Sequence, residues 1–400
     1  MTQSSVFTSR FVWFLFGRGI FSAIESIMAV AFAWHLYERT GDPFDLALVG
    51  LFQIVPVYLL FPITGWAVDH ISRSKILLAG ATMQLAVLSG FALLMMTPEF
   101  NKWYLLALIS LHGCGKAFMS PALQATLPNL VPPHHLNQAV AITSTVWNIA
   151  LTVGPFVAGI LIALLDRHIY WLLVAAALAT LTCFYQIPTM GAANTGKGKR
   201  DLLGGLRFVR HNQIVLGSLS LDLFIVLLGS VVALLPVYAA DILKVGPEGL
   251  GFLRAMPAAG AVLMGIYLSR FKTEFDNTGN TLFVSLGVFA LSIIIFALSD
   301  TMWLAAGALF VYGASDMISV VIRGAAVQLN TPDELRGRVS AANSIFIASS
   351  NQLGDFRAGA VAAAVGPVAA TLAGGACAMV IAVGGAVWFK DLRRLKKIEN

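Results

Sequence analysis

The stretch that decides the fold reads GWAVDHISRSK, residues 65–75, and it separates two long apolar runs. Gly65 lies near the end of the first run, Asp69 at its edge, and Arg73 and Lys75 at the start of the second. Glycine lets two helices approach closely, and an aspartate at a membrane edge can cap the positive end of a helix or pair with a basic residue. The stretch therefore predicts a short polar connection between two membrane-spanning helices.

Composition extends this prediction to the whole chain. Of 400 residues, 58% are hydrophobic and 12% are charged, whereas soluble domains carry about 25% charged residues. So few charges cannot cover the exterior of a soluble protein, and much of the surface must face lipid. We therefore expect an all-α membrane protein with a lipid bilayer as its surroundings, and neither an enzyme nor a partner of nucleic acid.

Apolar runs long enough to cross a membrane occur twelve times. A bilayer core of about 30 Å requires about 20 apolar helical residues. The runs fall near residues 11–37, 45–69, 75–96, 102–127, 137–165, 169–189, 213–241, 249–269, 281–299, 301–328, 338–365 and 367–390. The long polar break at 190–212 predicts a cytoplasmic linker between an N-terminal six-helix half, 1–189, and a C-terminal half, 213–400.

Basic residues fall unevenly on the two sides of this map. With a cytoplasmic N-terminus, the inside segments hold 17 lysines and arginines and the outside loops hold 4. Such a bias fits the positive-inside rule. We expect a multi-pass protein of the inner (plasma) membrane with both termini in the cytoplasm.

The two halves contain matching stretches. Residues 50–56 align with residues 251–257 at an offset of 201, and residues 133–140 align with 332–339 at an offset of 199. Two matches at nearly the same offset, close to half the length, indicate two parallel six-helix repeats.

The 65–75 stretch resembles the signature of the major facilitator superfamily: glycine, three residues, aspartate, a basic residue, two residues and a basic pair. His70 and Ser74 stand where the family has basic residues. The resemblance implies the major facilitator fold, with Asp69 meeting the eleventh helix near Gly337 and Arg338. It assigns a gating role to this motif, carried here by Gly65, Asp69, Arg73 and Lys75.

Two further stretches point to export. Gly154 and Pro155 in the fifth run, followed by Gly159, resemble the fifth-helix antiporter motif of the superfamily. A structural kink and exporter-type gating both remain open as readings of this motif. Residues 331–339 and 351–355 resemble the efflux branch that includes enterobactin exporters.

Ionisable residues inside the predicted helices are concentrated on particular runs. Nine of them are costly in hydrocarbon and should face a cavity or a partner. They are Arg18, Glu25, Lys116, Asp222, Arg254, Asp316, Arg323, Asp355 and Arg357. Six lie on the first, fourth, seventh and tenth runs, three on the eighth and eleventh, and none on the others. In the major facilitator fold the first two groups line the central cavity.

Depth along the helices sorts these residues into roles. Asp222 and Asp316 lie near mid-membrane and are the leading candidates for proton coupling, with Glu25 next. A static ion pair, such as Glu25 with Arg18 on the same helix face, is the alternative. The candidates for the substrate cavity are Arg18, Lys116, Arg254, Arg323, Asp355 and Arg357, with a gate or entrance role for the last two.

The sequence contains no phosphate-binding loop and no soluble domain that could hydrolyse ATP, so we expect no cofactor. His112 and the pair His134-His135 lack companions with metal-ligand spacing, and we expect no metal site.

Together these features predict a secondary active transporter that rocks two halves around a central site. The favoured version is a functional monomer that exports a small polar organic molecule, siderophore or drug-like, in exchange for protons. One alternative is a nutrient or metabolite importer of the same fold. The other is a non-transporting membrane sensor or lipid-handling scaffold, although a scaffold needs no polar path.

Overall fold

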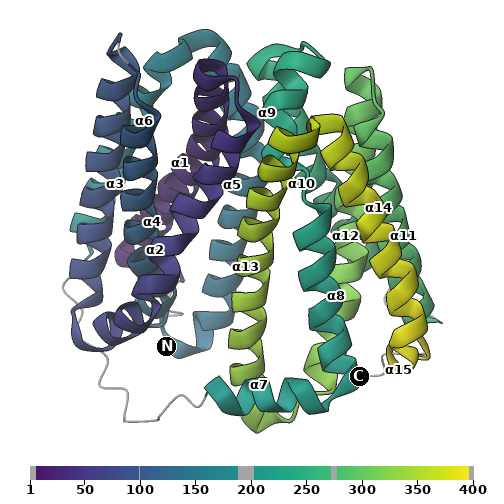
Figure 1. Ribbon diagram of the computed structural model, residues 1–400. Helices are drawn as coiled ribbons and strands as arrows, with labels where there is room; N and C mark the ends of the chain where they lie inside the picture. Colours follow the sequence, from purple (N-terminus) through teal and green to yellow (C-terminus); the bar gives the residue numbers. More distant parts are fainter. Residues whose placement is uncertain (1–5, 99, 188–201, 272–276, 396–400) are drawn as a thin grey trace. The chain divides into compact units, whose positions relative to one another are not determined.

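The computed structural model describes residues 6–98, 100–187, 202–271 and 277–395, and all of the regular structure in these ranges is helical (Figure 1). Twelve of the described helices have 17 or more residues. They are α1 (Ser9–Thr40), α2 (Pro43–His70), α3 (Arg73–Met96), α4 (Lys102–Thr126), α5 (Leu136–Leu165), α6 (Ile169–Tyr185), α8 (Gln213–Gly229), α10 (Gly246–Phe271), α11 (Thr278–Ala297), α12 (Met302–Leu329), α13 (Asp333–Val365) and α14 (Pro367–Trp388). The shorter α-helices are α7 (Leu202–His211), α9 (Leu235–Val237) and α15 (Lys390–Arg393).

Nine segments of the described helices are long and apolar enough to cross a membrane, and one of them covers both α5 and α6. Helices α4 and α13 are not among the nine, although they have 25 and 33 residues. His112 and Lys116 lower the hydropathy of α4, and many side chains of α13 before residue 349 lie outside the described residues. Both helices cover apolar runs that the sequence predicts, 102–127 and 338–365.

The chain divides into two compact units. Unit 1 comprises residues 1–40 and 48–197, and unit 2 comprises residues 41–47 and 198–400. Helix α7 lies within the segment 190–212 that the sequence marks as a linker. The domain boundaries at 189 and 213 stay a prediction.

The helices of each unit pack in the same pattern. In unit 1, α1 packs on α5 and α6, while α3 packs on α4 and α6. In unit 2, α8 packs on α13 and α14, while α11 packs on α12 and α14 (Figure 1). When the twelve long helices are counted in chain order, each of these contacts in unit 2 joins the two helices that stand six places after the pair in contact in unit 1. This correspondence is what an internal repeat of six helices requires.

Glycines allow one further helix pair in each unit to come close. A Cβ atom at Gly113 on α4 would overlap the backbone carbonyl of Gln53 on α2, and one at Gly313 on α12 would overlap that of Pro257 on α10. The two glycines are 200 positions apart, close to the offset of the sequence repeat. Tight packing through small residues is the usual way in which membrane helices associate.

Local chemistry sets several helix ends. The side chain of Asn101 accepts a hydrogen bond from the Trp103 amide at the start of α4, and that of Asn212 accepts from Ile214 and Val215 at the start of α8. Free amides at a helix start need such partners. Gly366, with a φ of 89°, makes the turn between α13 and α14 in a conformation that other residues rarely adopt.

The seventh apolar run differs from its prediction as one helix over 213–241. Helix α8 ends at Gly229, and a 3₁₀ turn, the short α9 and a π-helix over Tyr238–Ile242 follow. Side chains from α13 supply hydrogen-bond partners at this break, as described below. A break inside an apolar run is tolerated where protein groups bind the freed backbone atoms.

Candidate functional site

Glu25 is the centre of the charged cluster in unit 1. Its carboxylate lies 3.0 Å from His112 Nε2 and 3.3 Å from Lys116 Nζ, both on α4. Gln84 Nε2 on α3 donates a 3.4 Å hydrogen bond to the same carboxylate. Three helices therefore converge on one acid, whose side chain is only 9% exposed. A buried carboxylate requires such partners because its charge is costly away from water.

The partner of Glu25 differs from the pair considered in the sequence. Arg18 shares a helix face with Glu25, but among the described residues it makes no ion pair, and its Nε is buried without a hydrogen bond. Glu25 instead reaches across to Lys116 and His112 on another helix. Lys116 is 40% exposed, so the cluster presents an accessible cation backed by an enclosed acid.

Arg323 is the centre of the corresponding cluster in unit 2. Its Nη1 contacts the Asp222 carboxylate on α8, and its Nη2 lies 3.7 Å from Asp316 on its own helix, α12. Asp222 and Arg323 are 14% and 8% exposed, whereas Asp316 is 40% exposed. One guanidinium thus faces an enclosed acid and an accessible acid at the same time.

The two clusters follow the repeat. In each unit an acid on the first long helix, Glu25 or Asp222, pairs with a base on the fourth, Lys116 or Arg323. Lys116 and Asp316 are 200 positions apart, and the exposed fraction of each side chain is 40%. The same place in the two units therefore presents accessible charges of opposite sign.

Asp355 and Arg357 are both directed at the end of α8. Asp355 Oδ1 accepts a 2.6 Å hydrogen bond from the Ser230 hydroxyl, and Arg357 Nε donates a 2.9 Å hydrogen bond to the Leu227 carbonyl. Arg254 on α10 adds an electrostatic attraction to Asp355. Carbonyls at a helix C-terminus have no partner in their own helix, and a cation there is favourable. These groups therefore stabilise the break in the seventh apolar run.

The structure describes only part of the loop motif at residues 65–75. Arg73 Nη1 donates a 2.7 Å hydrogen bond to the Ala125 carbonyl near the end of α4, and Lys75 is exposed. The packing of Gly65 and the side chain of Asp69 lie outside what the structure describes. The expected contact of Asp69 with the eleventh helix therefore stays a prediction.

Gly154 and Pro155 are buried in α5, at the contact with α1. A Cβ atom on Gly154 would lie 2.6 Å from the Cβ of Ser26, so only glycine fits this contact. The helix continues through Pro155 to Leu165. Close packing thus accounts for the glycine, and the gating role of the pair stays a prediction.

A separate cavity of about 650 Å³ lies at the end of α11, α14 and α15. Asn277, Asn280, Lys390, Arg393 and Arg394 provide its polar lining. None of the nine charges buried in the predicted helices lines it. The cavity is therefore distinct from both charged clusters.

With the helices and both clusters in place, the chain can be compared with known proteins. Residues 4–399 match the major facilitator family MFS_3, described as Transmembrane secretion effector. The chain belongs to this family. It is accordingly a multi-pass membrane transporter of an efflux-type family, and not an enzyme.

Relatives of this MFS_3 chain include several efflux proteins. It is 25% identical over 383 residues to the multidrug efflux pump Tap of Mycolicibacterium fortuitum, covering 90% of both chains. The enterobactin exporter EntS of Escherichia coli O1:K1 / APEC is 26% identical, over 83% of this chain and 80% of that one. Macrolide efflux protein A of Streptococcus pyogenes is 24% identical, and the match spans 64% of this chain and 65% of that protein, slightly under two thirds.

Solved structures confirm the fold of the MFS_3 chain. The nucleoside transporter NupG superimposes with a TM-score of 0.68 at 14% identity, covering 96% of this chain and 100% of that one. A peptide transporter POT in complex with sulfate gives a TM-score of 0.73 at 13% identity, covering 98% and 97%. The predicted twelve-helix major facilitator fold is therefore confirmed, as is the resemblance to the enterobactin-exporter-like branch.

The sequence alone did not predict the contacts of several polar residues of this transporter. His112 and Gln84, which hold Glu25, look in the sequence like isolated polar residues in apolar runs. Their role follows only from the packing of α1, α3 and α4. His35 and Glu38 share a face of α1 three residues apart, but the residue that completes their cluster is far away in the sequence.

Proposed function

We propose that this protein exports a small polar organic molecule, siderophore or drug-like, in exchange for protons by alternating access. The efflux activity in the names of its relatives supports the direction. The proposal places the protein in the inner (plasma) membrane as a functional monomer with both termini in the cytoplasm. The fold alone would equally accommodate an importer.

The observation that carries the coupling proposal is the sharing of Arg323 between two acids. Asp222 is enclosed and contacts Arg323 directly, while Asp316 is accessible and more distant from it. A carboxylate that gains a proton loses its attraction to a neighbouring guanidinium. A protonated Asp316 would no longer attract Arg323, which would then pair with Asp222 alone. Loss of the proton would make the two acids compete for Arg323 again. Asp316 is therefore the proposed proton carrier, and Asp222 the fixed partner.

The proposed substrate class rests on the positive charge of Lys116. Its ammonium is accessible, while Glu25 and His112 on its inner side are enclosed. An accessible cation attracts an anionic or electron-rich group on a substrate. A polar substrate that carries such a group, as catecholate siderophores do, fits this charge.

Proton movement in proteoliposomes tests the proposal. Purified protein is reconstituted with a pH-sensitive dye inside, and enterobactin or a radiolabelled macrolide is supplied as the probe. We expect probe-driven proton movement with the parent and at least a tenfold loss with Asp316→Asn. The matched control is Asp300→Asn, an exposed acid between α11 and α12, which should behave like the parent.

Two readouts separate the parts of the proposal. Exchange of probe across the membrane without a proton gradient should survive in Asp316→Asn, because binding does not require the proton.

Probe movement that is independent of protons, with Asp222→Asn and Asp316→Asn both matching the parent, would show that the acids are structural. Accumulation of probe driven by inward proton flow in the same direction would favour an importer. A response to the probe without any flux would favour a sensor.

A further inference from the structure

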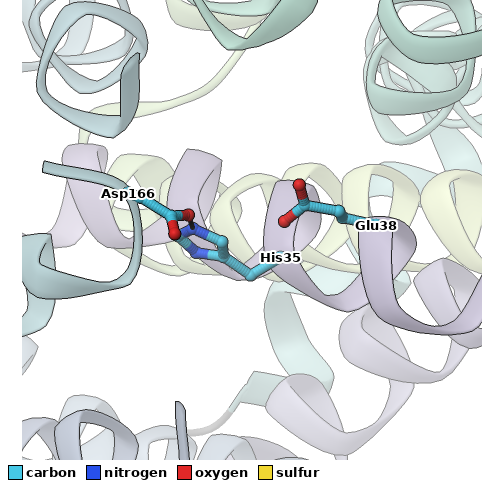
Figure 2. Close-up of side chains that lie close together, drawn as sticks. All are labelled: His35, Glu38 and Asp166. Carbon is cyan, nitrogen blue, oxygen red and sulfur yellow. Dashed lines mark ion pairs between the residues drawn. The ribbon is translucent and has the colours of Figure 1, made fainter. Parts of the chain in front are cut away.

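His35, Glu38 and Asp166 form a cluster that the transport proposal does not use. His35 and Glu38 lie near the end of α1, and Asp166 lies in the turn between α5 and α6, all within unit 1. One ligand atom from each residue lies within 4.8 Å of the other two. Figure 2 shows the imidazole directed at the Asp166 carboxylate, with the Glu38 carboxylate facing the same space.

The imidazole of His35 is held rigidly and presents one nitrogen to the two acids. Its side chain is 3% exposed, and its Nδ1 lies 3.1 Å from the Tyr170 hydroxyl. Tyr170 itself stacks against Phe32 and Phe91, which fixes the hydroxyl in place. A second partner that fixes the other ring nitrogen is the usual support of a metal-binding histidine.

His35 Nε2 has no hydrogen-bond partner in the described residues despite its burial. It lies 3.4 Å from Asp166 Oδ1, which is within ion-pair distance but without hydrogen-bond geometry. A buried nitrogen aimed at two acids without a hydrogen bond is an open ligand.

The charges around the cluster leave room for a cation. Glu38 and Asp166 repel one another. Arg167 Nε lies 3.3 Å from Asp166 Oδ2, on the other oxygen from the one that faces His35. Arg39 lies over the ring of Phe100, and both arginines attract Glu38 without an ion-pair contact to it in the described residues. Oδ1 therefore stays available while Arg167 orients the carboxylate from behind.

From this geometry we propose that His35, Glu38 and Asp166 bind a divalent transition-metal cation of the Zn²⁺ type. One imidazole nitrogen and two carboxylate oxygens are ligands that Zn²⁺ accepts at about 2.0–2.2 Å. Ligand atoms of a tetrahedral site at such distances are about 3.4 Å apart. His35 Nε2 and Asp166 Oδ1 already have this separation, so a movement of the exposed Glu38 side chain completes the set. The bound cation joins the end of α1 to the turn between α5 and α6.

Zinc titration of tag-free protein in detergent tests this site. After treatment with a chelator and its removal, calorimetry should detect one Zn²⁺ per chain, and Zn²⁺ should raise the unfolding temperature. Glu38→Gln and Asp166→Asn should each weaken binding at least tenfold. Both positions are exposed, and asparagine has the size and shape of the aspartate that it replaces at residue 166, so these variants should keep the fold. His35→Gln should abolish binding.

Histidines outside the cluster provide the controls. His168 is exposed in the same turn as Asp166, and His168→Gln should bind zinc like the parent. The adjacent pair His134 and His135 has ring centroids 4.2 Å apart and is the competing zinc ligand. Absence of zinc binding by the parent overturns the proposal. So does binding that survives in all three cluster variants but disappears when His134 and His135 are both replaced by glutamine.

Discussion

At the scale of the residue, Glu25 joins three helices through one carboxylate. Replacement by glutamine removes the charge that balances Lys116 and leaves His112 buried beside a neutral group. Breaking a buried ion pair costs ~3–5 kcal/mol, and the partial exposure of Lys116 reduces the expected loss to about 2–3 kcal/mol. Unfolding of purified Glu25→Gln by heat or denaturant in detergent measures this loss.

Arg18 on the same helix is the matched control for Glu25. Because it makes no ion pair among the described residues, Arg18→Gln should destabilise the protein less than Glu25→Gln. A double-mutant cycle with Lys116→Met then isolates the interaction of the pair. Equal losses for the two single variants at residues 18 and 25 would show that Glu25 has no special structural role.

Residue types and depth were sufficient to find the buried charges, but not their partners. Helical spacing shows which residues share a face of one helix, and it suggested Arg18 as the partner of Glu25. The actual partner, Lys116, lies on a different helix, and only the packing of α1 against its neighbours brings the two together. The same limit hid Asp166, which lies 131 positions from His35 in the sequence.

At the scale of the element, glycines decide how closely α10 and α12 pack. A methyl group at Gly313 would overlap the carbonyl of Pro257, whereas one at Gly307 on the same helix meets no atom within 4 Å. Gly313→Ala should therefore destabilise the protein by about 1–3 kcal/mol through overpacking. Gly307→Ala should stabilise it by up to about 1 kcal/mol, because alanine favours helix more than glycine.

Thermal unfolding of the two glycine variants in the same detergent measures this difference. Gly113→Ala in unit 1 should behave like Gly313→Ala, because it would overlap the carbonyl of Gln53. If Gly313→Ala stabilised the protein as much as Gly307→Ala, the result would contradict the prediction and show that α10 and α12 move apart at little cost. The test applies to both halves of the repeat.

Apolar periodicity predicted the existence of the helices better than their interruptions. The sequence around Gly229 and Ser230 reads as one apolar run, and the helix-ending residues Gly229 and Pro236 do not interrupt its apolar pattern. The break depends on Asp355 and Arg357, which reach it from α13. An interruption that is stabilised by a distant helix cannot be found from the local sequence.

At the scale of the whole molecule, the repeat was visible in the sequence only as two weak matches. The structure extends it to helix packing, to the glycines at 113 and 313, and to the charges at 116 and 316. Apolar helices resemble one another by composition, so sequence identity between the halves decays while the packing geometry persists. The change from Lys116 to Asp316 shows how one scaffold acquires different chemistry in its two halves.

The charge bias predicts the orientation of the molecule in the membrane, and thiol labelling measures it. Seventeen basic residues on one side against 4 on the other predict cytoplasmic termini. In a variant with Cys114, Cys183 and Cys377 replaced by serine or alanine, Asp300→Cys should react with an impermeant maleimide in intact cells. Lys75→Cys should react only after permeabilisation. Both positions are exposed, Asp300 between two apolar runs and Lys75 at the first residue of one, so accessibility reports sidedness. Labelling in the reverse pattern would place both termini outside and would contradict the assignment.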